Sequence, residues 1–161
     1  MDIYQFAMGM ETAGREYYLK MADASPGHSG KRIYTILADE ELRHYELLKA
    51  MGEGQAAPVL SEHLEEAEAV FQSLVGSGPL GEHLPGGEAY LQGIELEDKS
   101  IVYYRDKALT EEDPRARVLF LKLYFEEKKH KLLLENILEM IQEPEMQFAS
   151  PELERPLTPE L

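Results

Sequence analysis

Residues 37–44 read Leu-Ala-Asp-Glu-Glu-Leu-Arg-His, and residues 123–130 read Leu-Tyr-Phe-Glu-Glu-Lys-Lys-His. Each stretch contains a Glu followed three residues later by a His, giving the pairs Glu41–His44 and Glu127–His130. Residues three apart on a helix are neighbours on one face. Apolar residues recur at helical spacing around both pairs, so each pair is predicted to point toward a helical core or close to it.

The two stretches belong to a predicted internal repeat with an offset of 86 residues. A further glutamate precedes each Glu–His pair by 30 residues, namely Glu11 before Glu41 and Glu97 before Glu127. The pair Tyr17-Tyr18 maps to Tyr103-Tyr104 at the same offset. Core leucines would repeat in any duplicated bundle, but Glu and His at matching offsets indicate a shared chemical site.

Four long segments have helical periodicity, at about residues 2–24, 30–51, 87–109 and 113–142. Gly52 is predicted to cap the second helix in a left-handed conformation. Asp113 followed by Pro114 is a typical helix start.

The lengths of the connections between the four predicted helices indicate the topology. Short loops join the first helix to the second and the third to the fourth, so each pair is expected to form an antiparallel hairpin. The crossover, residues 52–87, contains a short amphipathic helix predicted at 61–71. Two hairpins joined by one long crossover predict an all-α, ferritin-like four-helix bundle over residues 1–142, without a sheet. Residues 143–161 are predicted to form a Pro-rich C-terminal tail.

Composition limits the partners and the chemistry. The net charge of −15 argues against nucleic acid and against an acidic membrane surface, because binding to either needs basic patches. The chain has no Cys, so a metal must be held by carboxylate, imidazole or backbone oxygen. Neither a secretory signal nor a membrane-length apolar run is recognised in the sequence, and a cytoplasmic location is therefore expected.

Burying the repeated carboxylates needs a compensating positive charge. The cationic residues of these helices, Arg43 among them, are predicted to fall mainly on outward positions. Two divalent cations would neutralise four carboxylates, and two such ions are expected per bundle. The predicted ligands form the set typical of di-iron and di-manganese carboxylate bundles: Glu11, Glu41, His44, Glu97, Glu127 and His130. Iron is the metal expected, with manganese or zinc as alternatives. The competing interpretation is a duplicated bundle whose Glu and His residues lie on a solvated face.

Two tyrosines follow the predicted ligands of the first and third helices. Tyr18 and Tyr104 lie seven residues after Glu11 and Glu97, which is two turns along the same stripe. Each phenol is predicted either to support the site, by bonding a ligand carboxylate or lining the oxidant pocket, or to be a core tyrosine with a satisfied hydroxyl. Tyr17 and Tyr103, like most core aromatics, are interpreted as packing residues.

The chain resembles the rubrerythrin-like branch of the ferritin-like superfamily, over roughly residues 1–142. The matching stretches are Met10–Tyr18, Leu37–His44, Leu96–Tyr104 and Phe125–His130. The resemblance implies a carboxylate-bridged di-iron centre that reduces peroxide or oxidises ferrous iron, in a protein that commonly forms a homodimer.

The resemblance also implies roles for the ligands. Glu41 and Glu127 would bridge the metals, and each His would cap one of them. Glu11 and Glu97 would be terminal or switching ligands.

The sequence departs from rubrerythrin itself in two respects. Rubrerythrin carries a Cys-ligated iron that supplies electrons, whereas this chain has no Cys and would need an external electron donor. Rubrerythrin also has an extra Glu in the third helix that can replace a His, but here Ile94 and Ser100 flank Glu97. The symmetric ligand set is similar to that of bacterioferritin as well, although the Gly/Pro-rich crossover is not.

The leading functional hypothesis is a di-iron oxidoreductase that uses peroxide or oxygen. One alternative is iron storage or delivery without turnover, and another is a structural bundle that its metal merely staples together. Whether the protein is an enzyme is left open by the sequence.

Overall fold

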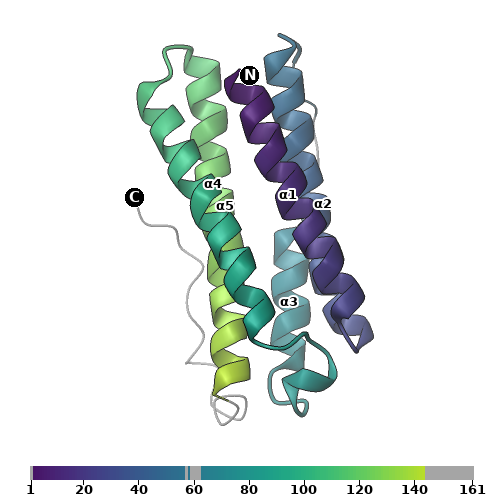
Figure 1. The fold of residues 1–161 in the computed structure, drawn as a ribbon. Coiled ribbons are helices and arrows are strands. Elements are labelled where there is room, and N and C mark those ends of the chain that lie inside the picture. Colours follow the sequence, from purple (N-terminus) through teal and green to yellow (C-terminus); the bar gives the residue numbers. More distant parts are fainter. Residues whose placement is uncertain (1, 57, 59–62, 144–161) are drawn as a thin grey trace.

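The computed structural model describes residues 2–56, 58 and 63–143, and in these residues all regular secondary structure is helical (Figure 1). The helices are α1 (Ile3–Ala24), α2 (His28–Gly52), α3 (Leu64–Leu74), α4 (Glu88–Thr110) and α5 (Pro114–Gln142), with a short 3-10 turn, η1, at Leu80–Glu82. The all-α ferritin-like prediction is confirmed. The crossover helix starts three residues later than predicted, and residues 61 and 62 lie outside the described residues. The predicted Pro-rich tail, apart from Glu143, also lies outside them.

Helix starts follow the local sequence closely. Asp2 caps α1, because its carboxylate accepts a hydrogen bond of 2.7 Å from the Gln5 backbone N–H. Asp113 caps α5 in the same way, at 3.0 Å from the Arg115 N–H, and Pro114 occupies the first helical turn.

The prediction for the end of α2 is wrong in detail. Gly52 is still helical, and the left-handed residue is Gly54, with φ of +70°. The Glu53 N–H still bonds the Lys49 carbonyl at 3.0 Å, so the helical hydrogen bonds continue past the glycine. A glycine signals an available left-handed position, but the hydrogen bonds decide which of two nearby glycines takes it.

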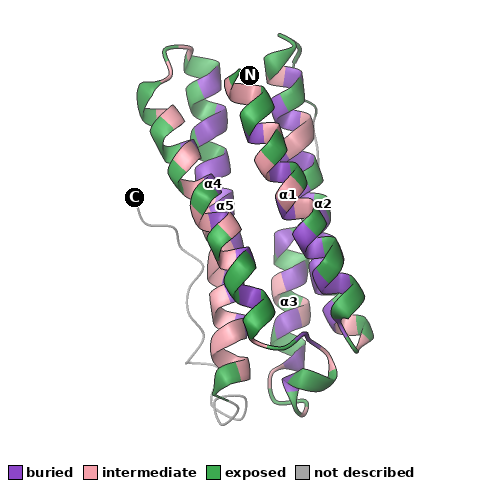
Figure 2. Ribbon diagram, in the orientation of Figure 1, coloured by how far each residue is buried: buried purple, intermediate pink, exposed green. Residues whose placement is uncertain are grey.

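The helices form two hairpins, α1 with α2 and α4 with α5, which lie side by side (Figure 1). The crossover helix α3 packs against α2 and also contacts α5. Buried residues cover the helix faces that turn inward (Figure 2). None of the helices in the described residues is long and apolar enough to cross a membrane.

The apolar core is divided into two clusters. One contains Tyr18, Leu37 and Leu134, and the other contains Ala7, Leu48 and Leu123. Along α1, α2 and α5 the predicted metal ligands lie between members of these two clusters. The middle of the bundle is therefore polar and is sealed at both ends by apolar packing.

Candidate metal centre

The fold brings all six predicted ligands together in the polar middle of the bundle. Each of the four long helices contributes, with Glu11 from α1, Glu97 from α4, and one Glu–His pair from each of α2 and α5. All six residues are at most 5% exposed. The alternative of a solvated Glu and His face therefore does not describe this bundle.

The six side chains divide into two groups, each with four potential ligand atoms within 4.8 Å of one another. The first group is Glu11, Glu41, His44 and Glu127. The second is Glu41, Glu97, Glu127 and His130. Glu41 and Glu127 belong to both groups, whereas the other four residues each belong to one. Two cations held in these groups would share the two carboxylates from the Glu–His pairs.

Each histidine faces the carboxylate of the opposite hairpin. His44 Nδ1 lies 3.1 Å from Glu127 Oε1, and His130 Nδ1 lies 2.9 Å from Glu41 Oε1. The two imidazole rings stack with centroids 5.6 Å apart and planes inclined by 10°. The two Glu–His pairs, which are related by the 86-residue offset, thus make equivalent contacts with each other across the centre.

The electrostatics of the cluster disfavour the ionised form of all four glutamates at once when no cation is bound. Burial raises the pKa of Glu41 and of Glu127, and the neighbouring Glu11 charge raises both further. Burial also opposes ionisation of Glu11, but the charge of the adjacent His44, together with hydrogen bonds from Glu41, His44 and Glu127, outweighs it and lowers the pKa of Glu11 to about 2. One carboxylate is therefore favoured as the anion while its two neighbours tend to hold protons.

The imidazoles respond to the same charges. Burial lowers the pKa of His44, but Glu11 and Glu127 more than reverse this and raise it well above the ordinary value. For His130, hydrogen bonding to Glu127 and Glu97 likewise overcomes burial and raises the pKa. Without a metal, protons supply the positive charge that the carboxylates need, and a cation entering the centre must displace them.

Two buried carboxylate oxygens test whether a cation would fit. Oε2 of Glu11 and Oε2 of Glu127 have no hydrogen-bond partner among the residues that the structure describes, although each approaches an imidazole Nδ1, at 3.4 Å and 3.1 Å respectively. A buried acceptor without a partner costs about 1–3 kcal/mol. Metal coordination would satisfy both oxygens, and the carboxylate and imidazole donors are those that iron, manganese and zinc accept. The residues present therefore fit a metal site.

The two repeated tyrosines support the carboxylates that are not shared. The Tyr18 hydroxyl donates to Glu97 Oε1, and the Tyr104 hydroxyl donates to Glu11 Oε1. Each bond crosses between α1 and α4. Because both tyrosines are fully buried, these bonds satisfy their hydroxyls and hold the carboxylates in place at once.

The neighbouring tyrosines pack elsewhere, as interpreted from the sequence. Tyr17 donates to the Ala89 carbonyl at 2.9 Å, and Tyr103 donates to the Ile3 carbonyl at 2.8 Å.

The prediction that Arg43 points outward is wrong. Arg43 is only 5% exposed, and its guanidinium pairs with Glu40 at 3.0 Å and with Glu126 at 2.7 Å. Glu126 Oε2 in turn lies 2.6 Å from His44 Nε2. A carboxylate at this nitrogen fixes the imidazole so that Nδ1 faces the centre.

Arg43 could have been suspected from two signals in the sequence. Glu40 precedes it by three residues on the same helix, and Glu126 repeats Glu40 at the offset of 86. Helical periodicity alone does not predict the burial of Arg43, because α3 and α5 cover a face of α2 that an isolated helix would expose.

The fold and the site together define a class: a ferritin-like helical bundle with a buried carboxylate–histidine cluster that suggests metal binding. The rubrerythrin family model matches residues 2–138, which is most of the chain. The protein belongs to the rubrerythrin family. Neither the curated proteins nor the solved structures compared with the chain gave a match.

Proposed function

We propose that this protein is a di-iron carboxylate oxidoreductase that reduces peroxide, or oxidises ferrous iron with peroxide or oxygen. The observation that carries the proposal is the sharing of Glu41 and Glu127 between two buried four-ligand groups. A single metal would not need both groups. Iron is the metal proposed, because carboxylate-rich sites with one imidazole per ion suit it and the family resemblance implies it.

The side chains would divide the work. Glu41 and Glu127 would bridge, while Glu11 with His44 and Glu97 with His130 would complete the two positions. Bound ferrous iron would polarise the oxidant and supply the electrons that reduce it.

The surrounding residues would keep that chemistry contained. The apolar clusters on either side would exclude water, and Tyr18 and Tyr104 would hold the terminal carboxylates through their hydrogen bonds. Since the chain has no Cys, the electrons for peroxide reduction would come from a separate donor. The homodimer remains a prediction.

The test is iron content followed by reaction with peroxide. Anaerobic Fe(II) titration should give two ions per chain, and added hydrogen peroxide should be consumed as the iron is oxidised. The variant Glu41→Ala/Glu127→Ala should lose both properties. The control Glu16→Ala/Glu95→Ala removes two exposed carboxylates and should keep both.

The same experiment separates the alternatives. Stoichiometric iron that peroxide does not oxidise would support a structural staple and contradict the oxidoreductase. A native mass of many subunits with mineralised iron would favour storage. Absence of stoichiometric metal in the wild type would reject the centre itself.

A further inference from the structure

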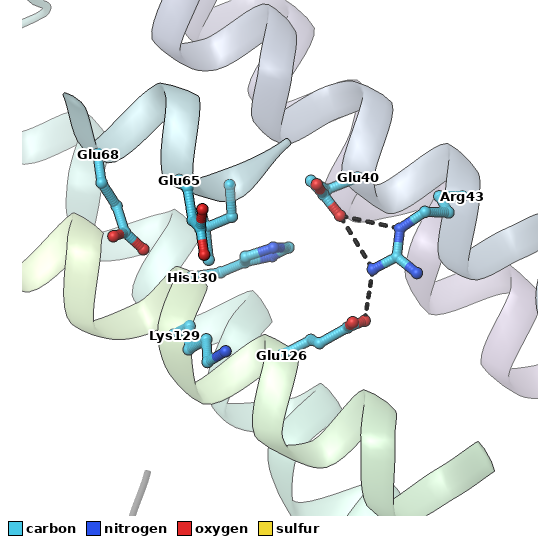
Figure 3. Close-up of a pocket in the computed structure, with 8 residues that line it drawn as sticks. Glu40, Arg43, Glu65, Glu68, Glu126, Lys129 and His130 are labelled. Carbon is cyan, nitrogen blue, oxygen red and sulfur yellow. Dashed lines mark hydrogen bonds and ion pairs between the residues drawn. The ribbon is translucent and has the colours of Figure 1, made fainter. Parts of the chain in front are cut away.

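A hollow of about 410 Å³ lies beside the candidate metal centre, between α2, α3 and α5 (Figure 3). Four carboxylates line it, from Glu40, Glu65, Glu68 and Glu126. The cationic residues around it are Arg43 and Lys129. The least exposed of the lining residues is His130, which is itself a proposed metal ligand.

His130 connects the hollow to the centre. Its Nδ1 atom faces inward, 2.9 Å from Glu41 and 3.1 Å from Glu127. Its other ring nitrogen, Nε2, has no hydrogen-bond partner among the described residues, although His130 is only 1% exposed. The buried imidazole of His130 therefore lies between the hollow and the metal centre. Its Nε2 atom is not engaged in a hydrogen bond with the residues of the centre.

The matching histidine is closed off. His44 Nε2 is bonded to Glu126, whereas the residue that repeats Glu126 at the 86-residue offset, Glu40, is held elsewhere. Arg43 binds Glu40 through one carboxylate oxygen, and the His63 backbone N–H binds the other. Glu126 thus closes off His44, whereas Glu40, which Arg43 and the His63 backbone hold, does not bond His130.

The charges in the hollow favour a cation. Arg43 is already paired with two of the four carboxylates. Glu65 and Glu68 project from α3 toward the hollow (Figure 3), and apart from His130, Lys129 is the other basic side chain that lines it. Two of the lining residues, Glu40 and His130, also belong with His44 to a third buried group of potential ligand atoms within 4.8 Å of one another.

Other hollows fit less well. A groove on α1 and α4 is lined mainly by apolar residues such as Phe6 and Met10. Another, beside α2, places Lys31 and Arg32 at its wall. Neither contains a proposed ligand of the centre.

We propose that the hollow is the port through which divalent cations reach the metal centre, guided by Glu65 and Glu68 and passing His130. This inference rests on the proposed metal centre. A cation would first reach the position formed by Glu41, Glu97, Glu127 and His130. A negatively lined cleft raises the rate at which cations arrive, and salt weakens that effect.

The test follows the rate at which Co(II) binds to the metal-free protein, measured by stopped-flow absorbance. The variant Glu65→Gln/Glu68→Gln should load about tenfold more slowly, with unchanged stoichiometry and a weaker dependence on salt. The control Glu16→Gln/Glu95→Gln removes the same charge from exposed sites on α1 and α4 and should load like the wild type. Lys129→Gln should load faster, which damage to the fold would not produce.

The outcomes separate the port from the centre. If the wild type binds two Co(II) ions but the Glu65→Gln/Glu68→Gln variant loads at the wild-type rate, the port is wrong and the centre stands. If the control variant binds Co(II) as slowly as Glu65→Gln/Glu68→Gln, the slowing comes from the change in net charge alone, and the port proposal is wrong. If the wild type binds no Co(II) stoichiometrically, the centre and its port both fail.

Discussion

His44 on α2 places its Nδ1 atom 3.1 Å from Oε1 of Glu127 on α5, in the other hairpin. The reciprocal contact joins His130 to Glu41 at 2.9 Å. The histidine of each Glu–His pair therefore contacts the glutamate of the pair in the opposite hairpin. A metal bound there would tie the two hairpins together, so metal binding and bundle stability should be linked.

Metal should raise the stability of the whole bundle. Ligand at about 100 times its dissociation constant stabilises by about 2.7 kcal/mol, which corresponds to roughly 5–10 °C in Tm for a chain of this size. Mn(II) added to metal-free protein should give this shift in a thermal melt. Glu41→Ala/Glu127→Ala should abolish the shift, and an equal shift in that variant would show that the metal acts elsewhere.

The metal-free protein should lose stability as pH rises. Wherever a pKa is raised by folding, the native state binds more protons than the unfolded chain, so stability falls with increasing pH. Glu41 and Glu127 act this way above their unfolded pKa of about 4.3, and the histidines act likewise above about 6.5.

Glu11 acts in the opposite direction. Because its pKa is lowered, its contribution to stability grows as pH rises from about 2 to 4.3 and stays fully present at higher pH. The contribution of the centre should therefore peak near pH 4–5 and fall toward pH 8. Urea unfolding with EDTA across this range measures the slope, which Mn(II) should flatten. If Glu41→Gln/Glu127→Gln leaves the pH dependence of the unfolding free energy unchanged, that dependence arises from groups outside the centre.

Replacing Arg43 should destabilise the protein strongly. Arg43→Met leaves Glu40 and Glu126 buried with their shared cation removed, which typically costs about 3–5 kcal/mol. Chemical denaturation measures the loss. Adding Glu40→Gln and Glu126→Gln to the variant should recover much of it. Lys129→Met, at the repeat-related and half-buried position, should cost far less.

Gly14 should matter for metal binding more than for folding. A Cβ at this position would lie 2.8 Å from Glu41 Oε2, the flexible end of a proposed bridging carboxylate. Gly14→Ala should fold and weaken Mn(II) binding measured by calorimetry, because the carboxylate must move. Gly9→Ala on the same helix meets nothing within 4 Å. It should leave affinity unchanged and stabilise the helix by about 0.5–1 kcal/mol.

The tyrosine hydroxyls should tune metal affinity. Tyr18→Phe and Tyr104→Phe each remove the bond to a terminal carboxylate, and losing such support typically costs 10–100-fold in affinity. Competition with a chelator of known affinity measures the change. Tyr17→Phe removes only a bond to a backbone carbonyl, so its affinity should match the wild type. Equal effects in all three variants would indicate general loosening of the bundle.

Much of the fold follows from local sequence. Helix caps at Asp2 and Asp113, and the apolar periodicity between them, are properties of neighbouring residues, so the long helices are found within a few residues of their predicted bounds. The end of α2 shows the limit of such signals, because Gly52 and Gly54 are equally able to adopt the left-handed conformation and the helical hydrogen bonds, which continue to Glu53, select Gly54.

The sequence by itself determined the helices and the six candidate ligands, because i,i+3 spacing places each Glu beside its His on one face and the 86-residue offset marks both sites. Tertiary structure alone decided which carboxylates belong to both ligand groups, since that depends on how two hairpins meet. It also decided that Arg43 is buried and that His130 borders a hollow. Both follow from the packing of α3 against α2 and α5, which no local pattern in either long helix encodes.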